Sequence, residues 1–269
     1  MTVIDTEPPI PNNHTEIQDP RTLELSAGAG IVEVSFGTSN PKMLQESLAL
    51  REDFVVRAKW FEPGHKEWDM YDDNESTLHL AGRKEVNSPL EVGMRLTPVR
   101  SSVGESLTWS MLNQDMAQQV NETQMDNGIS AVNYLNNLAI NGNLYDLTRL
   151  VSGKITSMDD INYIKSSMME LFGVAAGAIR KEKMNDTEQL KDVRWLFATT
   201  DSMWSVLNDD LGVQMKVIAE GQVSEGDDFK TLLCLVEQED AIDYIYEHPD
   251  DCAYSLQYLD NGLRKANAL

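Results

Sequence analysis

VRWLFATTDSMWSVLNDDLG, residues 193–212, joins a strand pattern directly to a helix pattern. Residues 193–200 are mostly apolar, as in a central strand, and residues 201–212 have the apolar spacing of a helix that ends at Gly212. The segments VQMKVIAEG and FKTLLCLVE, which follow, predict two more strands. We therefore expect an α/β or α+β fold, with a mixed, mostly antiparallel central sheet flanked by helices.

The same alternation of strands and helices extends toward the N-terminus. Apolar periodicity predicts strands at 31–37, 77–83, 90–98 and 144–151, and helices from Pro41 to about Lys59 and over 158–181. A turn-like NSP joins the strands at 77–83 and 90–98, which predicts a hairpin. The sequence has no glycine-rich phosphate loop of the dinucleotide or P-loop kind between these elements.

Composition divides the chain into one domain and two flanking segments. Residues 1–28 are rich in Pro, Asn and Thr, which predicts a mobile leader. Residues 29–240 predict one domain, and within it the Asn-, Gln- and Met-rich stretch 104–143 predicts an inserted lobe of two short helices. Residues 241–269 predict an acidic C-terminal helical segment.

The charge of the chain excludes some classes of partner. The 44 acidic residues outnumber the 22 basic ones and give a formal net charge of −22. Such a surface repels nucleic acid, whose binding depends on Lys and Arg. The sequence lacks an apolar run of about eighteen residues and a secretory pattern, so we expect a cytoplasmic protein without a membrane span. Cys234 and Cys252 are expected to be structural thiols.

Carboxylates and aromatic residues gather in EWDMYDDN, residues 67–74, before the strand at 77–83. Two carboxylates there, Asp69 and Asp72, can act on one cationic ligand, and their mutual repulsion requires a compensating group. Arg95 lies in the middle of an apolar strand, so it is the expected compensator. Asp146 and Arg149 fall on opposite faces of an ideal strand, so a kink or bulge is needed for both to serve one site.

These residues leave two interpretations open: buried ion pairs that only orient the sheet, or a site for a zwitterionic, amino-acid-like ligand. A hard-cation site made by His65, Glu67, Asp69 and Asp72 is disfavoured because the spacing does not match a calcium loop and lacks its glycine. We expect no metal. None of the four histidines has a nucleophile motif nearby that would indicate Ser/His or Cys/His catalysis.

Several of these motifs, in this order, resemble the acyl-homoserine lactone (autoinducer) synthases. The first are Arg51, Phe54, Arg57 and Trp60, followed by EWDMYDDNESTLHLAG and the strand VGMRLTP. YDLTRLV then resembles the family's Glu-Ser/Ala-Ser-Arg-Phe strand, with Asp146 in place of the family's Glu and Arg149 matching its Arg. VRWLFATTDSMWSVLNDDLGVQMKVIAEG resembles the closing strand, helix, glycine and strand. The resemblance covers roughly residues 31–237 apart from the insertion.

The resemblance implies an N-acetyltransferase-like fold whose sheet is splayed in the middle to admit a thioester. The implied reaction is acyl transfer from acyl carrier protein or coenzyme A to the amine of S-adenosylmethionine, then lactone closure with release of methylthioadenosine. No cofactor beyond these substrates is implied. Asp146 and Arg149 would be the catalytic residues. The substrate-binding residues would be Arg51, Phe54, Trp60, Asp69, Asp72 and Arg95.

Apolar residues of the long helix and the later strands, such as Met168, Phe172 and Trp195, would line an acyl tunnel, or would be ordinary core. Two rival functions remain open from the sequence. One is an acyltransferase of the same fold that acylates another amine, such as an amino acid, from coenzyme A. The other is a non-catalytic ligand- or partner-binding protein on the same scaffold.

Overall fold

The computed structural model describes residues 22–27, 30–59, 61–184, 187–222 and 230–269. In that part of the chain, eight strands form one sheet in the order β1-β2-β3-β4-β5-β6-β8-β7. The strands are β1 (Thr22–Ala27), β2 (Gly30–Phe36), β3 (Leu78–Arg83), β4 (Val92–Val99), β5 (Leu144–Ser152), β6 (Arg194–Thr200), β7 (Met215–Gly221) and β8 (Thr231–Glu237). All neighbouring pairs are antiparallel except β5 and β6, which are parallel. The expected mixed, mostly antiparallel sheet is confirmed.

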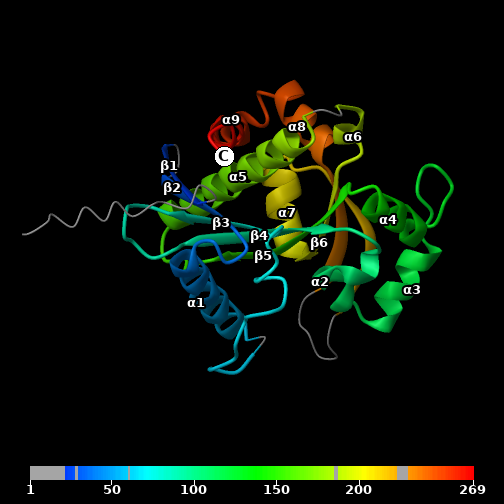
Figure 1. Ribbon diagram of the computed structural model, residues 1–269, viewed down its shortest axis with the longest axis horizontal. Helices are drawn as coiled ribbons and strands as arrows, with labels where there is room; N and C mark the ends of the chain where they lie inside the picture. Colours follow the sequence, from blue (N-terminus) through cyan, green and yellow to red (C-terminus); the bar gives the residue numbers. More distant parts are fainter. Residues whose placement is uncertain (1–21, 28–29, 60, 185–186, 223–229) are drawn as a thin grey trace, which may run out of the picture.

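Helices cover both faces of this sheet (Figure 1). The helices are α1 (Pro41–Arg57), α2 (Leu107–Ser110), α3 (Gln114–Glu122), α4 (Ala131–Ile140), α5 (Met158–Glu182), α6 (Thr187–Lys191), α7 (Asp201–Ser205), α8 (Gln238–Glu247) and α9 (Ala253–Ala266). A short 3-10 turn, Val103–Glu105, precedes α2, and a π-helical turn, Val206–Asp210, continues α7.

The longest helix, α5, organises the main core. Ser157 caps its N-terminus by accepting a hydrogen bond from the Asp160 N–H, and the Asp160 carboxylate accepts from Ser157 N in return. The apolar side chains of α5 pack on β2 to β6 and β8, and α8 and α9 pack around them. A second apolar cluster lies on the other face, between α3, α4 and strands β5 to β8. A third, smaller cluster lies under α1.

Strands β5 and β6 part in the middle of the sheet. Their register runs from Leu144 opposite Arg194 to Leu147 opposite Phe197 and stops there, although β5 continues to Ser152 and β6 to Thr200. This is the splay that the family resemblance implied. Backbone groups of β5 beyond Leu147 on the β6 side are therefore outside the ladder.

A β-bulge in β5 follows directly after this point. Gly93 pairs with Val151 and Arg95 pairs with Thr148, so two residues of β5 lie opposite one of β4. Arg149 is one of the two, and its φ of 57° is in the left-handed region. The bulge moves Arg149 to the sheet face that Asp146 occupies, as the sequence required for the two to serve one site.

Three elements differ from the expectations. Residues 22–27, assigned to the leader, form β1 and pair with β2 at the edge of the sheet, because their alternating TLELSA can extend the ladder. The insertion holds three short helices rather than two: Ser106 caps α2 and Asn113 separately caps α3. The C-terminal segment belongs to the main core, in which Ile242 and Leu259 are buried. None of the described helices has the length and apolar character needed to cross a bilayer.

Candidate functional site

Arg95 lies at the centre of a buried ionic cluster on the α1 side of the sheet. Its side chain is fully buried. Its Nη1 donates to Asp69 Oδ1 at 2.7 Å and to Asp72 Oδ1 at 2.9 Å, and its Nε donates to Thr148 Oγ1 at 3.1 Å. Arg51 of α1 donates to the same Asp72 oxygen at 2.7 Å. The expected compensation of Asp69 and Asp72 by Arg95 is confirmed.

Arg149 extends this cluster toward the surface. From the bulge its Nη2 donates to Asp69 Oδ2 at 3.0 Å, and its Nη1 pairs with Glu67 Oε2. The other carboxylate oxygen of Glu67 lies 3.0 Å from His65 Nε2. Three arginines thus face three carboxylates, which gives the cluster no net charge and compensates each buried ion.

Side chains of the loop before β3 point alternately into the cluster and toward solvent. Glu67 is buried and Asp69 is largely so, whereas Trp68 and Met70 between them are 53% and 74% exposed. The ring of Tyr71 lies 5.6 Å from the Arg95 guanidinium, and its hydroxyl donates to the backbone carbonyl of Glu105 at 2.5 Å. The loop therefore joins the arginines to the inserted lobe.

The arginines decide the charge state of the two aspartates. Burial alone would raise the pKa of Asp69, but hydrogen bonds and attraction from Arg95 and Arg149 outweigh burial and lower it. Arg51 and Arg95 lower the pKa of Asp72 against burial in the same way. Asp72 has both oxygens occupied, since its Oδ2 accepts from the Asp69 N–H at 3.1 Å. In this structure Asp72 orients Arg51 and Arg95, and its contact with a ligand stays a prediction.

A histidine that was not among the predicted site residues lies beside this cluster. His79 of β3 is directly opposite Arg95 in β4, and its Nδ1 is 3.5 Å from Arg51 Nη2. Burial, together with the nearby charge of Arg51, lowers the pKa of His79 to about 4, so the ring is neutral near pH 7. A polar residue inside the apolar strand TLHLAGR was the available signal, the same signal that selected Arg95.

Asp146 lies under α2, on the same sheet face as the cluster. Its Oδ2 accepts from the backbone N–H of Thr108 at 3.1 Å, while its Oδ1 has no hydrogen-bond partner among the described residues. Burial raises the pKa of Asp146, although the hydrogen bonds from Thr108 oppose this. Asp146 therefore anchors the inserted lobe to β5. Nothing in the sequence pointed to Thr108 as its partner.

Several buried polar atoms of the site have no hydrogen-bond partner among the described residues. They include Arg95 Nη2, Arg149 Nε and Asp146 Oδ1, as well as His79 Nε2. Arg95 and Arg149 bond the same Asp69, and Asp146 lies two residues before Thr148, the residue opposite Arg95. Two unused guanidinium donors and one unused carboxylate acceptor fit the carboxylate and the ammonium of an amino acid.

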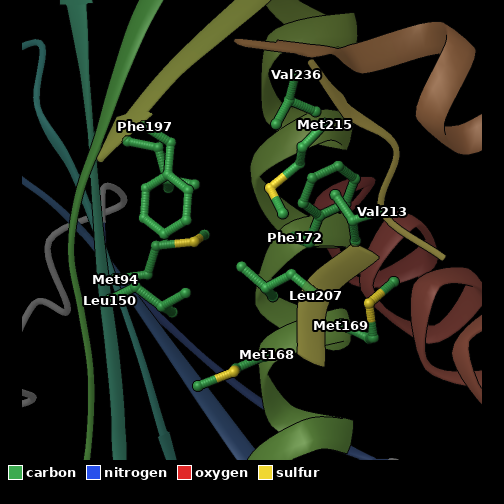
Figure 2. Close-up of a pocket in the computed structure, with 11 residues that line it drawn as sticks. Met94, Leu150, Met168, Met169, Phe172, Phe197, Leu207, Val213, Met215 and Val236 are labelled. Carbon is green, nitrogen blue, oxygen red and sulfur yellow. The ribbon is translucent and has the colours of Figure 1, made fainter. Parts of the chain in front are cut away.

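An apolar cavity of about 20 Å³ lies on the opposite face of the sheet, next to the point where β5 and β6 part. Figure 2 shows Met94, Leu150 and Phe197 on the sheet side of the cavity, facing Met168 and Phe172 of α5. Four of the lining residues are methionines, whose flexible side chains can adjust to different shapes. Met168 and Phe172 line this cavity, and whether it is part of an acyl tunnel or ordinary core stays a prediction. Trp195 is fully buried core, and its ring lies tilted against that of Phe172 with 4.4 Å between the ring centroids.

Two predicted binding residues are aromatic. Phe54 is half-buried and packs on the small apolar cluster under α1, and Trp60 lies outside the described residues. Their contact with a substrate stays a prediction. In the described ranges, histidine, cysteine, aspartate and glutamate side chains form no group of three or more that could hold a metal ion.

Comparison with known proteins gives matches among solved structures alone. No protein-family model matches the sequence. No curated protein matches it in a search of such proteins.

The solved structures similar to this chain include the following three. BjaI, a coenzyme A-dependent acyl-homoserine lactone synthase with SAM and isopentyl-CoA bound, is 13% identical at a TM-score of 0.48, over 92% of this chain and 100% of that chain. TofI in an apo form is 15% identical at a TM-score of 0.45, over 87% of this chain and 98% of that chain. An acyl-CoA N-acyltransferase from Pseudomonas aeruginosa is 14% identical at a TM-score of 0.41, over 76% of this chain and 98% of that chain. The similar structures thus include a member of the family that the sequence motifs resemble.

Proposed function

We propose that this protein is an acyltransferase that moves an acyl group from a thioester to the amine of an amino-acid-like acceptor. One observation carries the proposal. Where β5 leaves β6, an apolar cavity lies on one face of the sheet, and unpaired guanidinium and carboxylate atoms lie on the other. An acyl chain suits the first environment and a zwitterion suits the second.

S-Adenosylmethionine is the acceptor that we propose in particular. Its amino acid end would place its carboxylate at Arg95 and Arg149 and its amine toward Asp146. Asp69 reaches the surface with 18% of its side chain exposed, and it would attract the sulfonium cation. The products would be an acyl-homoserine lactone, the free thiol and methylthioadenosine, as the sequence resemblance implies.

The thioester would reach the acceptor through the splay between β5 and β6. Backbone N–H groups of β5 that are released from the ladder beyond Leu147 are suited to stabilise the oxyanion that develops on the carbonyl oxygen. The acyl chain would enter the apolar cavity, which must widen from about 20 Å³ by movement of its methionine side chains. Both acyl-coenzyme A and acyl carrier protein are candidate donors.

The test combines calorimetry with product analysis. We expect S-adenosylmethionine to bind, free methionine to bind more weakly, and Arg95→Leu to remove binding of both, because it deletes the unpaired donor. Incubation with S-adenosylmethionine and a panel of acyl thioesters should release methylthioadenosine and an acylated lactone, detected by mass spectrometry. An open N-acylated product from another amino acid would instead identify the rival acyltransferase. Failure of every donor and acceptor to react would refute acyl transfer.

A further inference from the structure

Asp146 is a buried carboxylate that the inserted lobe holds through one of its two oxygens. The residue is 1% exposed, and its Oδ2 accepts from the Thr108 backbone N–H at 3.1 Å. Its Oδ1 has no hydrogen-bond partner among the residues that the structure describes. A carboxylate that is fixed through one oxygen presents the other in a defined direction, and the proposed function places the acceptor amine at that free oxygen.

The first turn of α2 supplies the groups that hold this carboxylate. Ser106 caps the helix by accepting from the Trp109 N–H at 3.0 Å, which leaves the Thr108 N–H for Asp146. Hydrogen bonds from the Thr108 hydroxyl and the Leu107 N–H also favour the charged carboxylate. Thr108 is itself 2% exposed, so these donors are shielded from bulk water, which strengthens their effect.

Contacts on both sides of Thr108 keep α2 in place over Asp146. Just before the helix, the Glu105 carbonyl accepts from the hydroxyl of Tyr71, which belongs to the loop of the ionic cluster. Within the helix, Trp109 packs on the apolar cluster between α3, α4 and strands β5 to β8. The docking of the inserted lobe on the sheet therefore sets the position of Thr108 relative to the carboxylate.

Two titratable groups outside the lobe also face Asp146. Arg95 of β4 attracts its negative charge and favours the ionised form. Tyr71 lies close enough that burial and the charge of Asp146 together raise the pKa of the phenol. The residues directly opposite Asp146 in the neighbouring strands, Thr97 of β4 and Leu196 of β6, do not titrate. The charge state of Asp146 thus depends on burial, on α2 and on Arg95.

Resting on the proposed function, we infer that Thr108 is a positioning residue, which holds Asp146 through Oδ2 and so directs Oδ1 at the acceptor amine. Burial raises the pKa of Asp146, and the hydrogen bonds from Thr108 are the largest effect that opposes burial. The charged carboxylate accepts one proton from the acceptor ammonium at Oδ1, which frees the nitrogen lone pair for attack on the thioester. A protonated carboxyl group cannot do this. The inserted lobe thereby takes part in the reaction.

The experiment compares three variants of the full chain with wild type. Thr108→Val deletes the hydroxyl, Thr108→Ser keeps it, and Thr123→Val is the matched control. Thr123 lies in the same lobe, but its hydroxyl donates to the Gln119 and Ile218 carbonyls, at 2.8 and 3.2 Å, rather than to Asp146. The rate of thiol release is measured against pH, with S-adenosylmethionine and a panel of acyl-coenzyme A donors.

We expect Thr108→Val to shift the acid limb of kcat/KM upward by roughly one pH unit, a loss of roughly 10-fold on that limb. The reason is that removing a donor to the charged form disfavours that form. The pKa of Asp146, followed by NMR of isotope-labelled aspartate, should rise by the same amount. Thr108→Ser should keep the wild-type profile. Thr123→Val should lose stability in urea unfolding without any shift of the profile.

The outcomes separate the inference from the function on which it rests. If wild-type protein releases no thiol from any donor, the proposed function fails, and the inference fails with it. If wild-type protein is active and Thr108→Val keeps its pH profile and the pKa of Asp146, only the inference fails. The inference is equally overturned if Thr108→Val and Thr123→Val lose rate in parallel at every pH, or if Thr108→Ser does not keep the profile, because Thr108 would then be a structural residue of the lobe.

Discussion

The two faces of β5 differ in chemistry within six residues. On the α1 face, Asp146, Thr148 and Arg149 join a cluster of charges, whereas on the α5 face Leu147 and Leu150 line an apolar cavity. The bulge at Arg149 makes this possible, because regular alternation would point the arginine toward the cavity. A single strand therefore separates a cluster of charged side chains from an apolar cavity, the two environments on which the proposed function rests.

The largest loss of stability should come from removing Arg95, the centre of the charged cluster on the α1 face of the sheet, which we call the polar face. Arg95→Leu takes one cation from Asp69 and Asp72, and breaking a buried ion pair from one side costs about 3 to 5 kcal/mol. Arg100→Leu, an exposed arginine just after the same strand, should cost at most about 0.5 kcal/mol. Urea unfolding measures both. Equal losses of unfolding free energy in the two variants would mean that the buried ion pairs of Arg95 add nothing to stability.

We expect the second largest loss of stability on the apolar face, the α5 side of the sheet that lines the cavity. Met168→Ala removes buried side-chain atoms beside the cavity, which should cost about 2 to 5 kcal/mol and enlarge the space for an acyl chain. The donor preference should shift toward longer acyl chains, as measured by kcat/KM across a series of thioesters. Met158→Ala, at an exposed position on the same helix, should change neither quantity. An unchanged donor preference in Met168→Ala would separate the cavity from the donor site.

Lowering the pH should reduce the stability of the folded protein first through His79. Its pKa is lowered to about 4 in the folded state, against about 6.5 in an unfolded chain, so the unfolded state binds the proton more readily between these values. Stability should therefore fall as the pH drops from about 6.5 toward 4, by up to about 1.4 kcal/mol per pH unit.

The difference between wild-type protein and His79→Gln isolates this contribution. Asp69 and Asp72, whose pKa values are lowered, add their own loss only below their ordinary range near pH 4, and the raised pKa of Asp146 acts with the opposite sign. Both effects are common to the two proteins. The free energy of unfolding of His79→Gln should decline less between pH 6.5 and 4.5, and parallel curves would contradict the assignment.

The sequence predicted more of the polar face than of the apolar one. A charged residue in an apolar strand needs a partner wherever it lies, so Arg95 and the requirement for a bulge at Arg149 could be inferred from residue types alone. The choice of partners could not, because Asp69 and Asp72 are shared among three arginines through contacts between distant segments. Met168 and Phe172 were expected at an acyl tunnel or in ordinary core, and the sequence could not place them beside a cavity because that depends on the parting of β5 and β6.

The smallest predicted effect concerns the joint between the polar face and the inserted lobe. Tyr71→Phe deletes the hydroxyl that donates to the Glu105 carbonyl, and Tyr254→Phe deletes an equally long bond to the Asn162 carbonyl, both 2.5 Å, on another part of the surface. Each should cost about 1 kcal/mol of stability. Only Tyr71→Phe should also weaken S-adenosylmethionine binding in calorimetry, because only Tyr71 lies against Arg95 and helps to hold the lobe whose Thr108 bonds Asp146. If both variants bind the ligand like wild type, the lobe is not part of the acceptor site, and the polar face ends at the arginines.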